Sequence, residues 1–153
     1  MVAVMDTIVI HATPGATIAC DMTTAADSPE ERLAEYGHLY AHALVARDRT
    51  DDALVLTFAA KPGVWEWIAD LVRREAVCCP FFSYQVERRE NEIVWTTRAG
   101  ASPAALDAVE AMLDEFYAEP DRFDDGFDGL LAQLAGKGVN LVREEPGRLT
   151  MES

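Results

Sequence analysis

The sequence predicts an α+β fold, in which a small antiparallel or mixed sheet of about four to five strands carries three main helices. Two stretches with helical hydrophobic spacing begin at a Ser-Pro pair, and a third stretch alternates apolar and polar residues as a hairpin does. The elements follow in the order β-α-β-α-β-β-α, which favours helices on one face of the sheet. At 153 residues, we expect one α+β domain, 1–153, with its core at about 18–117 and an acidic extension at 118–153.

The amino-terminal part is expected to contain a strand followed by a long helix. Residues 2–11 are rich in β-branched and apolar side chains, which is typical of a strand, and residues 12–17 interrupt it. A capping box predicts the start of the helix, with Ser28 as the N-cap, Pro29 at the first helical position and Glu31 at the third. The expected inward stripe of this helix is Leu33, Tyr36, Tyr40, Ala43 and Leu44.

The middle of the chain predicts a strand, a helix and a hairpin. Residues 51–59 have the composition of a short strand, and a Lys-Pro-Gly turn then leads into a helix that runs to Cys78. Residues 81–98 predict a hairpin with a polar turn near Glu90 and Asn91. The residues expected to face inward are Val64, Ile68, Leu71 and Val72 in the helix and Phe82, Tyr84 and Val86 in the hairpin.

The remainder predicts a third helix and a less regular acidic segment. Residues 102–117 have helical spacing, with Leu106, Val109, Leu113 and Phe116 on one stripe. After Pro120 the chain is acidic and contains several glycines. We expect one short helix there, at Phe127–Ala135, and a last strand near Val139–Val142.

The composition narrows the classes of function. Asp and Glu outnumber Lys and Arg by 27 to 13, which gives a net charge of −14 and a pI of about 4.4. Such a charge repels phosphate backbones and anionic lipids, so we expect neither a nucleic-acid partner nor a membrane-surface role. The amino-terminal residues lack the basic segment of a secretory signal, and no apolar run reaches transmembrane length. We therefore expect a cytoplasmic protein whose thiols are reduced.

Two adjacent cysteines, Cys78 and Cys79, are the most unusual feature of the sequence. Consecutive Cα atoms are about 3.8 Å apart, whereas relaxed disulfides need about 4.4–6.8 Å, so we expect two free thiols. One interpretation is structural, because cysteine packs as a small apolar residue at the end of a core helix. Pro80 disfavours helix at the residue before it, so the thiols are expected where the chain turns from helix to strand.

Glu75 is the second unusual residue. At 100° per residue it lies in the middle of the apolar arc formed by Ile68, Leu71 and Val72, one turn before the two thiols. A carboxylate directed into a core is costly unless it is paired or binds a ligand. The alternative interpretation is a frayed helix end, with Glu75 half exposed or paired with Arg73 or Arg74.

A third cysteine, Cys20, follows a Pro-Gly turn in what we expect to be a loop, where it could supply a third thiolate. Three thiolates from two segments suit Hg(II), As(III) or Cu(I), and Zn(II) with a fourth ligand. The spacing is not that of a zinc finger. The predicted metal ligands are therefore Cys20, Cys78 and Cys79, and the identity of the soft metal or metalloid ion is unknown.

The residues of these motifs resemble a known group of proteins. The run Ile-Ala-Cys near Cys20, the amphipathic helix after it, and Glu-x-x-Cys-Cys-Pro-Phe-Phe from Glu75 are similar to a group of small actinobacterial domains. These domains are associated with MerR-type, metal-responsive proteins, and the similarity covers about 18–116. The resemblance implies handling of heavy metals or metalloids. This chain lacks a basic helix-turn-helix portion, so we do not expect a DNA-binding regulator.

Histidines offer a further possible set of ligands. Glu31, Glu35, His38 and His42 share one face of the first long helix, at spacings that can bind a metal. That face is opposite the apolar stripe, which is typical of a solvated surface. His11 stands apart as a possible additional ligand.

The leading hypothesis is a cytoplasmic protein that binds a soft metal or metalloid ion for sequestration or detoxification, as a monomer or a homodimer. One alternative is a cysteine-dependent enzyme, such as a carbon–metal bond lyase, in which Glu75 moves the proton and Cys79 is the reacting thiol. Another is a haem-binding module, because Cys79-Pro80 matches the dipeptide of haem-regulatory motifs and thiolates bind haem iron.

Overall fold

The computed structural model describes most of the chain from residue 6 to residue 99 and several later segments. The described residues are 6–14, 19–21, 25–27, 29–99, 106–107, 109–110, 140–145 and 148–152, and of 19–21, 29–30, 33, 140–145 and 148–152 only the backbone is described.

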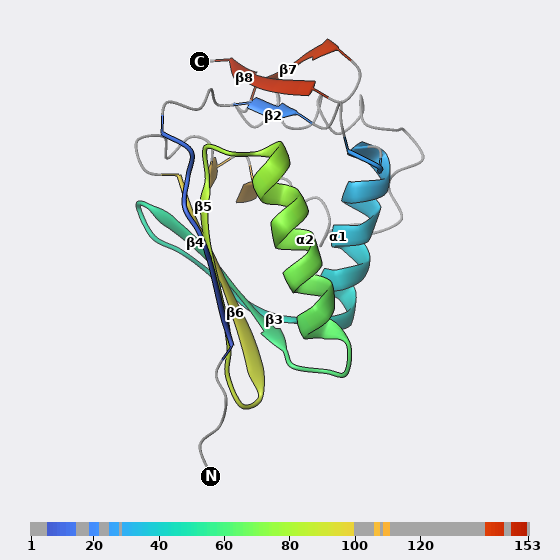
Figure 1. The fold of residues 1–153 in the computed structure, drawn as a ribbon, viewed down its shortest axis with the longest axis vertical. Helices are drawn as coiled ribbons and strands as arrows, with labels where there is room; N and C mark the ends of the chain where they lie inside the picture. Colours follow the sequence, from blue (N-terminus) through green and yellow to red (C-terminus); the bar gives the residue numbers. More distant parts are fainter. Residues whose placement is uncertain are drawn as a thin grey trace.

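A five-stranded antiparallel sheet forms the body of the fold (Figure 1). The strands, in spatial order, are β1 (Thr7–Ile10), β5 (Ser83–Arg88), β6 (Glu92–Arg98), β4 (Ala53–Ala59) and β3 (Leu44–Arg49). The predicted hairpin is confirmed as β5–β6, in which Arg88 pairs with Ile93 next to the turn. The α+β class is therefore confirmed, and the sheet is antiparallel throughout.

Two helices, α1 (Pro29–Ala43) and α2 (Val64–Cys78), cover the same face of the sheet (Figure 1). Helix α1 begins at Pro29, as predicted, but it ends at Ala43, and Leu44 starts strand β3 instead of continuing the helical stripe. Helix α2 begins after Gly63, whose φ of 83° lies in the left-handed region that glycine adopts without strain. It ends before Cys79, as the proline at position 80 requires.

The core lies between the sheet and the two helices. The inward stripe of α2 is completely buried, with Ile68, Leu71 and Val72 all 0% exposed. Alternation places Phe82, Tyr84 and Val86 of the hairpin segment in the same core, as the sequence predicted. Other large side chains in the core are Leu39, Tyr40, Leu54, Phe58, Ile93, Trp95 and Leu106.

A second, three-stranded sheet lies across the end of α2 at which β5 follows (Figure 1). Its order is β2 (Ala19–Asp21), β8 (Arg148–Glu152) and β7 (Asn140–Glu145), all antiparallel. Cys20 pairs with Leu149 in this sheet, so the expectation of a loop at Cys20 is wrong. The pairing partner of β2 is β8, which lies far along the chain, so the local sequence could not indicate this strand.

The prediction of three main helices is only partly met, because the described residues contain two long ones. Of the third, Leu106, Asp107, Val109 and Glu110 are helical, and the rest of 102–117 lies outside the described residues, as does the predicted helix at Phe127–Ala135. Three strands, β2, β3 and β8, were not predicted. Strand β7 overlaps the strand expected near Val139–Val142.

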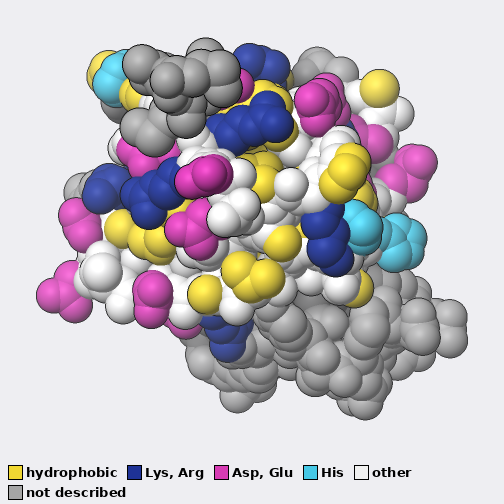
Figure 2. Space-filling view, turned by 90° about the horizontal axis from the view of Figure 1, so that it is seen from below, with side chains coloured by type: hydrophobic (Ala, Val, Ile, Leu, Met, Phe, Trp, Pro, Cys, Tyr) yellow, Lys and Arg dark blue, Asp and Glu magenta, His cyan; other side chains and the backbone are white. Residues whose placement is uncertain are grey.

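The surface mixes both signs of charge. At the end of the molecule opposite the small sheet, acidic and basic side chains alternate with scattered apolar ones (Figure 2). Elsewhere, the exposed Lys61 donates a hydrogen bond of 2.7 Å to the carbonyl of His42. Neither helix in the described part of the chain combines the length and the apolar character needed to cross a bilayer.

Candidate functional site

The two adjacent cysteines lie where α2 ends. The amide of Cys79 donates a 2.7 Å hydrogen bond to the Glu75 carbonyl, and the Cys79 carbonyl accepts one of 3.2 Å from Phe82. The carbonyl of Pro80 accepts a further bond, of 2.8 Å, from the amide of Thr13. These bonds fix the turn, and the two cysteines are buried, at only 3% and 4% exposed. Their burial is what the structural interpretation predicts. A guanidinium and a carboxylate also lie beside the two sulfurs, and packing alone does not require such charged neighbours.

Glu75 is directed inward, as its position on the helix predicted. Its Oε1 accepts a 2.7 Å hydrogen bond from Nη1 of Arg32 on α1, and its side chain is only 16% exposed. Its ion-pair partner is therefore neither Arg73, which is exposed, nor Arg74, whose guanidinium bonds to other carboxylates. The interpretation of Glu75 as a residue of a frayed helix end is wrong.

Arg32 is the residue that sequence reasoning missed. Its side chain is only 4% exposed, and its Nε and Nη2 donate hydrogen bonds to the two carboxylate oxygens of Asp27, the latter at 2.8 Å. Such a bidentate pair fixes the guanidinium plane. The signal was present, because Arg32 lies four residues before Tyr36 and seven before Leu39, on the inward stripe of α1.

The guanidinium and the carboxylate each lie next to one sulfur. Nη1 of Arg32 is 3.8 Å from Sγ of Cys78, and Sγ of Cys79 is 3.8 Å from Oε2 of Glu75. The ion pair therefore lies between two thiols that are neighbours in sequence, with the cation at Cys78 and the anion at Cys79. A carboxylate within hydrogen-bond range of a thiol can accept its proton.

Burial determines how these groups titrate. Desolvation raises the pKa of Glu75 above its ordinary value of 4.5, although hydrogen bonds from Arg32 and Tyr36 oppose the shift. For Arg32, desolvation acts to lower the pKa, but its bonds to Asp27 and Glu75 raise it above the ordinary value. Arg32 therefore remains charged, and Glu75 holds a proton more readily than an exposed glutamate would.

A second arginine extends the network over the outside of the two helices. Arg74 donates to Glu35 (2.9 Å), to Asp70 (2.8 Å) and to Asp27 (3.3 Å). Glu35 also accepts a 2.8 Å bond from the indole of Trp67, and its bonds to Arg74 and Trp67 lower its pKa. Asp27 thus connects the inner arginine to the outer one, and α1 and α2 are joined by charged groups as well as by the core.

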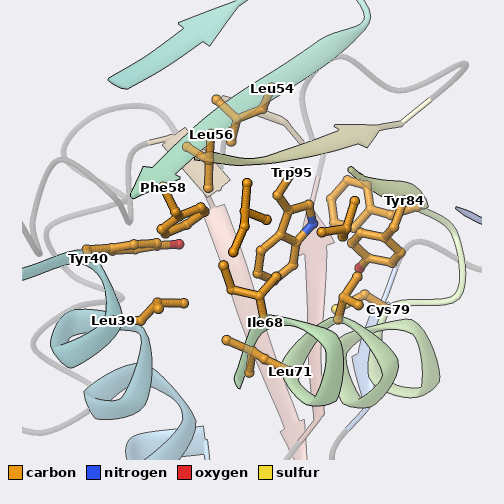
Figure 3. Close-up of a cluster of buried hydrophobic side chains, with 14 of the residues drawn as sticks. Leu39, Tyr40, Leu54, Leu56, Phe58, Ile68, Leu71, Cys79, Tyr84 and Trp95 are labelled. Atoms are coloured by element: carbon orange, nitrogen blue, oxygen red, sulfur yellow. The ribbon is translucent and has the colours of Figure 1, made fainter. Parts of the chain in front are cut away.

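Aromatic side chains border the thiols on the core side. Figure 3 shows Cys79 beside Tyr84, and Trp95 between Tyr84 and Phe58. The ring of Tyr84 is 6.4 Å from that of Trp95, and Tyr36 is 6.2 Å from the same indole. The indole N–H of Trp95 is buried and has no hydrogen-bond partner among the described residues. The aromatic rings of the core therefore reach as far as Cys79.

The third predicted ligand, Cys20, is brought towards this site by its strand. Strand β2 lies against α2, at the end that carries the cysteine pair (Figure 1). The side chain of Cys20 is outside what the structure describes, so the convergence of three thiolates stays a prediction. Within the described side chains, no three or more His, Cys, Asp and Glu residues form a group that could hold a metal ion.

The other candidate ligands are dispersed. Glu31, His38 and His42 are exposed on α1, and Glu35 is bound to Arg74. The His42 ring lies 6.5 Å from Trp67. His11 is exposed after β1. Glu31, His38 and His42 are therefore solvated, as the helical pattern predicted, whereas Glu35 is bonded to α2.

No protein-family model, no curated protein and no solved structure matches this chain.

Proposed function

We propose that this protein binds a soft metal or metalloid ion, such as Hg(II), As(III) or Cu(I), through the thiolates of Cys78, Cys79 and Cys20. Its role in the cytoplasm would be sequestration or detoxification. One observation carries the proposal: two adjacent, buried cysteines flank the Arg32–Glu75 ion pair, with Arg32 3.8 Å from the sulfur of Cys78 and Glu75 3.8 Å from that of Cys79. The resemblance to metal-associated domains agrees with it.

The ion pair supplies what thiol ligation needs. Binding a soft ion through two thiols releases two protons, because only the thiolate is a ligand. The positive charge of Arg32 stabilises a thiolate at Cys78, and the Glu75 carboxylate is placed to accept the proton of Cys79. Thiophilic ions provide the remaining driving force, since thiolates select soft metals over hard ones.

The position of β2 supports Cys20 as the third ligand. The strand is held against α2 through its pairing with β8, from Ala19–Thr150 to Asp21–Arg148. A thiolate on the face towards α2 would complete a three-coordinate site.

The proposal is tested by titrating the reduced protein with Hg(II), As(III) and Cu(I) while counting free thiols and measuring thiolate–metal charge-transfer absorbance. We expect one ion per chain and the loss of three titratable thiols. Each of the single variants Cys20→Ser, Cys78→Ser and Cys79→Ser should weaken binding sharply. His38→Ala, on the exposed face of α1, is the matched control and should change nothing. Full retention of binding in the double variant Cys78→Ser/Cys79→Ser would refute the proposal.

A second candidate function is a carbon–metal bond lyase, and the 3.8 Å approach of Glu75 to Cys79 favours it. The thiols would hold the metal while the carboxylic acid of Glu75 delivers a proton to the carbon atom that leaves as hydrocarbon. Incubation with phenylmercury distinguishes the two candidates. Release of benzene that is lost in Glu75→Gln indicates the lyase, whereas stable binding without benzene indicates a binding protein.

A further inference from the structure

Strand β1 is one edge of the five-stranded sheet, and among the described residues its neighbour is β5 alone (Figure 1). From Thr7 to Ile10 it carries no charged side chain, and its pairing with β5 is regular. Val9 is 54% exposed, which makes it one of the three exposed large apolar side chains in the described part of the chain. An uncharged, regular edge strand is a ready template for pairing with a further strand.

The opposite edge, β3, has the protection that β1 lacks. Arg47, Asp48 and Arg49 follow one another along it, and a bulge interrupts its pairing with β4. Arg49 also donates a 2.7 Å hydrogen bond to Asp107, so a later segment of the chain is bonded to this edge. Charges, bulges and covering segments are the means by which sheets prevent edge-to-edge pairing. The two edges therefore differ in their capacity to accept another strand.

The backbone of β1 determines which groups can pair. The amide of Arg88 donates a 2.8 Å hydrogen bond to the carbonyl of Asp6. In an antiparallel pair, residues that bond to the neighbouring strand alternate with residues whose N–H and C=O groups point away from it. The polar backbone groups of Ile8 therefore face β5, and those of Thr7 and Val9 point outward. No described residue bonds to these outward groups.

We propose that β1 pairs with β1 of a second copy of this chain, antiparallel and centred on Val9, so that two five-stranded sheets join into one sheet of ten strands. A twofold axis at Val9 places this residue opposite itself, where the two copies exchange N–H···O=C bonds. The same axis places Thr7 of each copy opposite His11 of the other.

The side chains of the two copies match in this register. Directly opposite residues of antiparallel strands lie on the same face, so Ile8 meets Ile10 of the other copy on the face that carries the helices. Both isoleucines are half-buried against the core of their own chain, and pairing would extend that core across the axis. On the other face the exposed Val9 meets itself and the exposed Thr7 meets His11.

The charge pattern favours a second copy as the partner. Each chain has a net charge of −14, which repels another copy over most of its surface. Along Thr7–Ile10, however, no like charges are opposed, whereas a strand from another protein would have to supply a matching uncharged edge. The pairing is therefore expected to be weak at low salt and to strengthen as salt screens the repulsion.

The test begins with sedimentation equilibrium of the full chain at concentrations up to about 1 mM, where even weak dimers are populated. The mean mass should rise from 16.8 kDa towards twice that value, and at lower concentration when salt is added. Hydrogen exchange then locates the contact. When about nine-tenths of the chains are paired, the amides of Thr7 and Val9 should exchange about tenfold more slowly, because they exchange from the unpaired chain. The amide of Ile8 already faces β5 and should change little.

Two variants separate this edge from the rest of the surface. Val9→Lys places two ammonium groups opposite each other at the axis and should abolish the dimer. Val45→Lys is the matched control, because Val45 is a 62% exposed valine on the other edge strand, and it should leave the dimer intact. Val9→Pro removes an N–H that points away from β5, so it should also abolish the dimer while β1 stays paired with β5.

The proposal is overturned if the chain stays monomeric at about 1 mM in high salt, or if folded Val9→Lys and Val9→Pro both dimerise as the parent does. Slow exchange of Thr7 and Val9 at every concentration would also overturn it, because another segment of the same chain would then cover the edge. If neither variant folds, exchange in the unmodified chain still decides. These measurements contain no metal, so their outcome is independent of the proposed function.

Discussion

Replacing Arg32 by Met should destabilise the protein, and more at pH 8 than at pH 5. Methionine retains most of the apolar stem that the arginine packs into the core. It removes the guanidinium that bonds to Glu75 and Asp27, so the variant leaves a carboxylate that is only 16% exposed without its cation.

The magnitude follows from the cost of separating a buried ion pair. Removing one partner typically costs about 3–5 kcal/mol. Glu75 retains the hydrogen bond of Tyr36 and some contact with solvent. We therefore expect the lower end of that range, about 3 kcal/mol of unfolding free energy at pH 8.

The pH dependence follows from the titration of Glu75. Its folded-state pKa is raised above 4.5, so the folded protein binds this proton more tightly than the unfolded chain does. The stability that this group contributes is therefore fully present at low pH and is lost as the pH rises through the raised folded value. Removing Arg32 takes away a hydrogen bond and a charge that lower the pKa of Glu75. The loss of stability with rising pH therefore becomes larger and extends to higher pH.

Each unit by which the pKa of Glu75 rises costs about 1.4 kcal/mol at pH values above it. Arg32 also lowers the pKa of Asp27, which keeps the neighbouring charge of Arg74 in the variant, so we expect Glu75 to dominate the difference between pH 5 and pH 8. The destabilisation by Arg32→Met should therefore be at least about 1 kcal/mol smaller at pH 5.

Urea denaturation at both pH values measures the effect, with Arg73→Met, an exposed arginine on α2, as the matched control. The double variant Arg32→Met/Glu75→Gln should lose most of the additional pH dependence. If Arg32→Met is equally destabilised at pH 5 and pH 8, the loss of the cation beside the Glu75 carboxylate is not the cause of the destabilisation. The electrostatic reasoning for the site would then be wrong.

Three further predictions concern packing and backbone. Ile68→Ala removes a completely buried side chain and should cost about 2–5 kcal/mol in urea denaturation, and a loss below about 1 kcal/mol would contradict the described core. Trp95→Phe removes a buried N–H that has no partner among the described residues, so this variant should lose less thermal stability than Trp95→Ala does. For Trp95→Ala we expect a loss of about 3–5 kcal/mol in the free energy of unfolding. Equal losses would indicate that the N–H is bonded. Gly63→Ala places a side chain at a φ of 83°, where no described residue lies within 4 Å of the new Cβ, so the conformation alone should cost about 1–2 kcal/mol by denaturation. No cost would mean that this turn rearranges freely.

Local patterns predicted those features that local forces decide. The hairpin followed from the alternation of Phe82, Tyr84 and Val86, because the period of a strand is imposed on each residue. The inward direction of Glu75 followed from helical geometry in the same way, and the structure confirms it. The start of α1 at Pro29 followed from the fixed φ of proline.

Features that depend on distant partners could not be predicted in this way. Arg32 and Glu75 are separated by 43 positions: helical spacing indicates that Arg32 faces inward, but no local pattern indicates that its partner is Glu75. Strand β3 has an exposed, charged surface and no apolar alternation, and it exists because β4 offers an edge to pair with. Cys20 was expected in a loop because its strand is completed only by β8.

The small sheet has a consequence for the order of folding and for local opening. The five-stranded sheet includes the pairs β3–β4 and β5–β6, whose strands are neighbours in sequence and can meet early. Strand β2 must instead find β8 near residue 149, after the closure of a very long loop. We expect the small sheet to form last and to open at a lower free energy than the core, and native-state hydrogen exchange would show β2 exchanging before β6. Because β2 lies against α2, each such opening would uncover the end of that helix and give a solute in the surrounding water a route to sulfur atoms that are buried at rest.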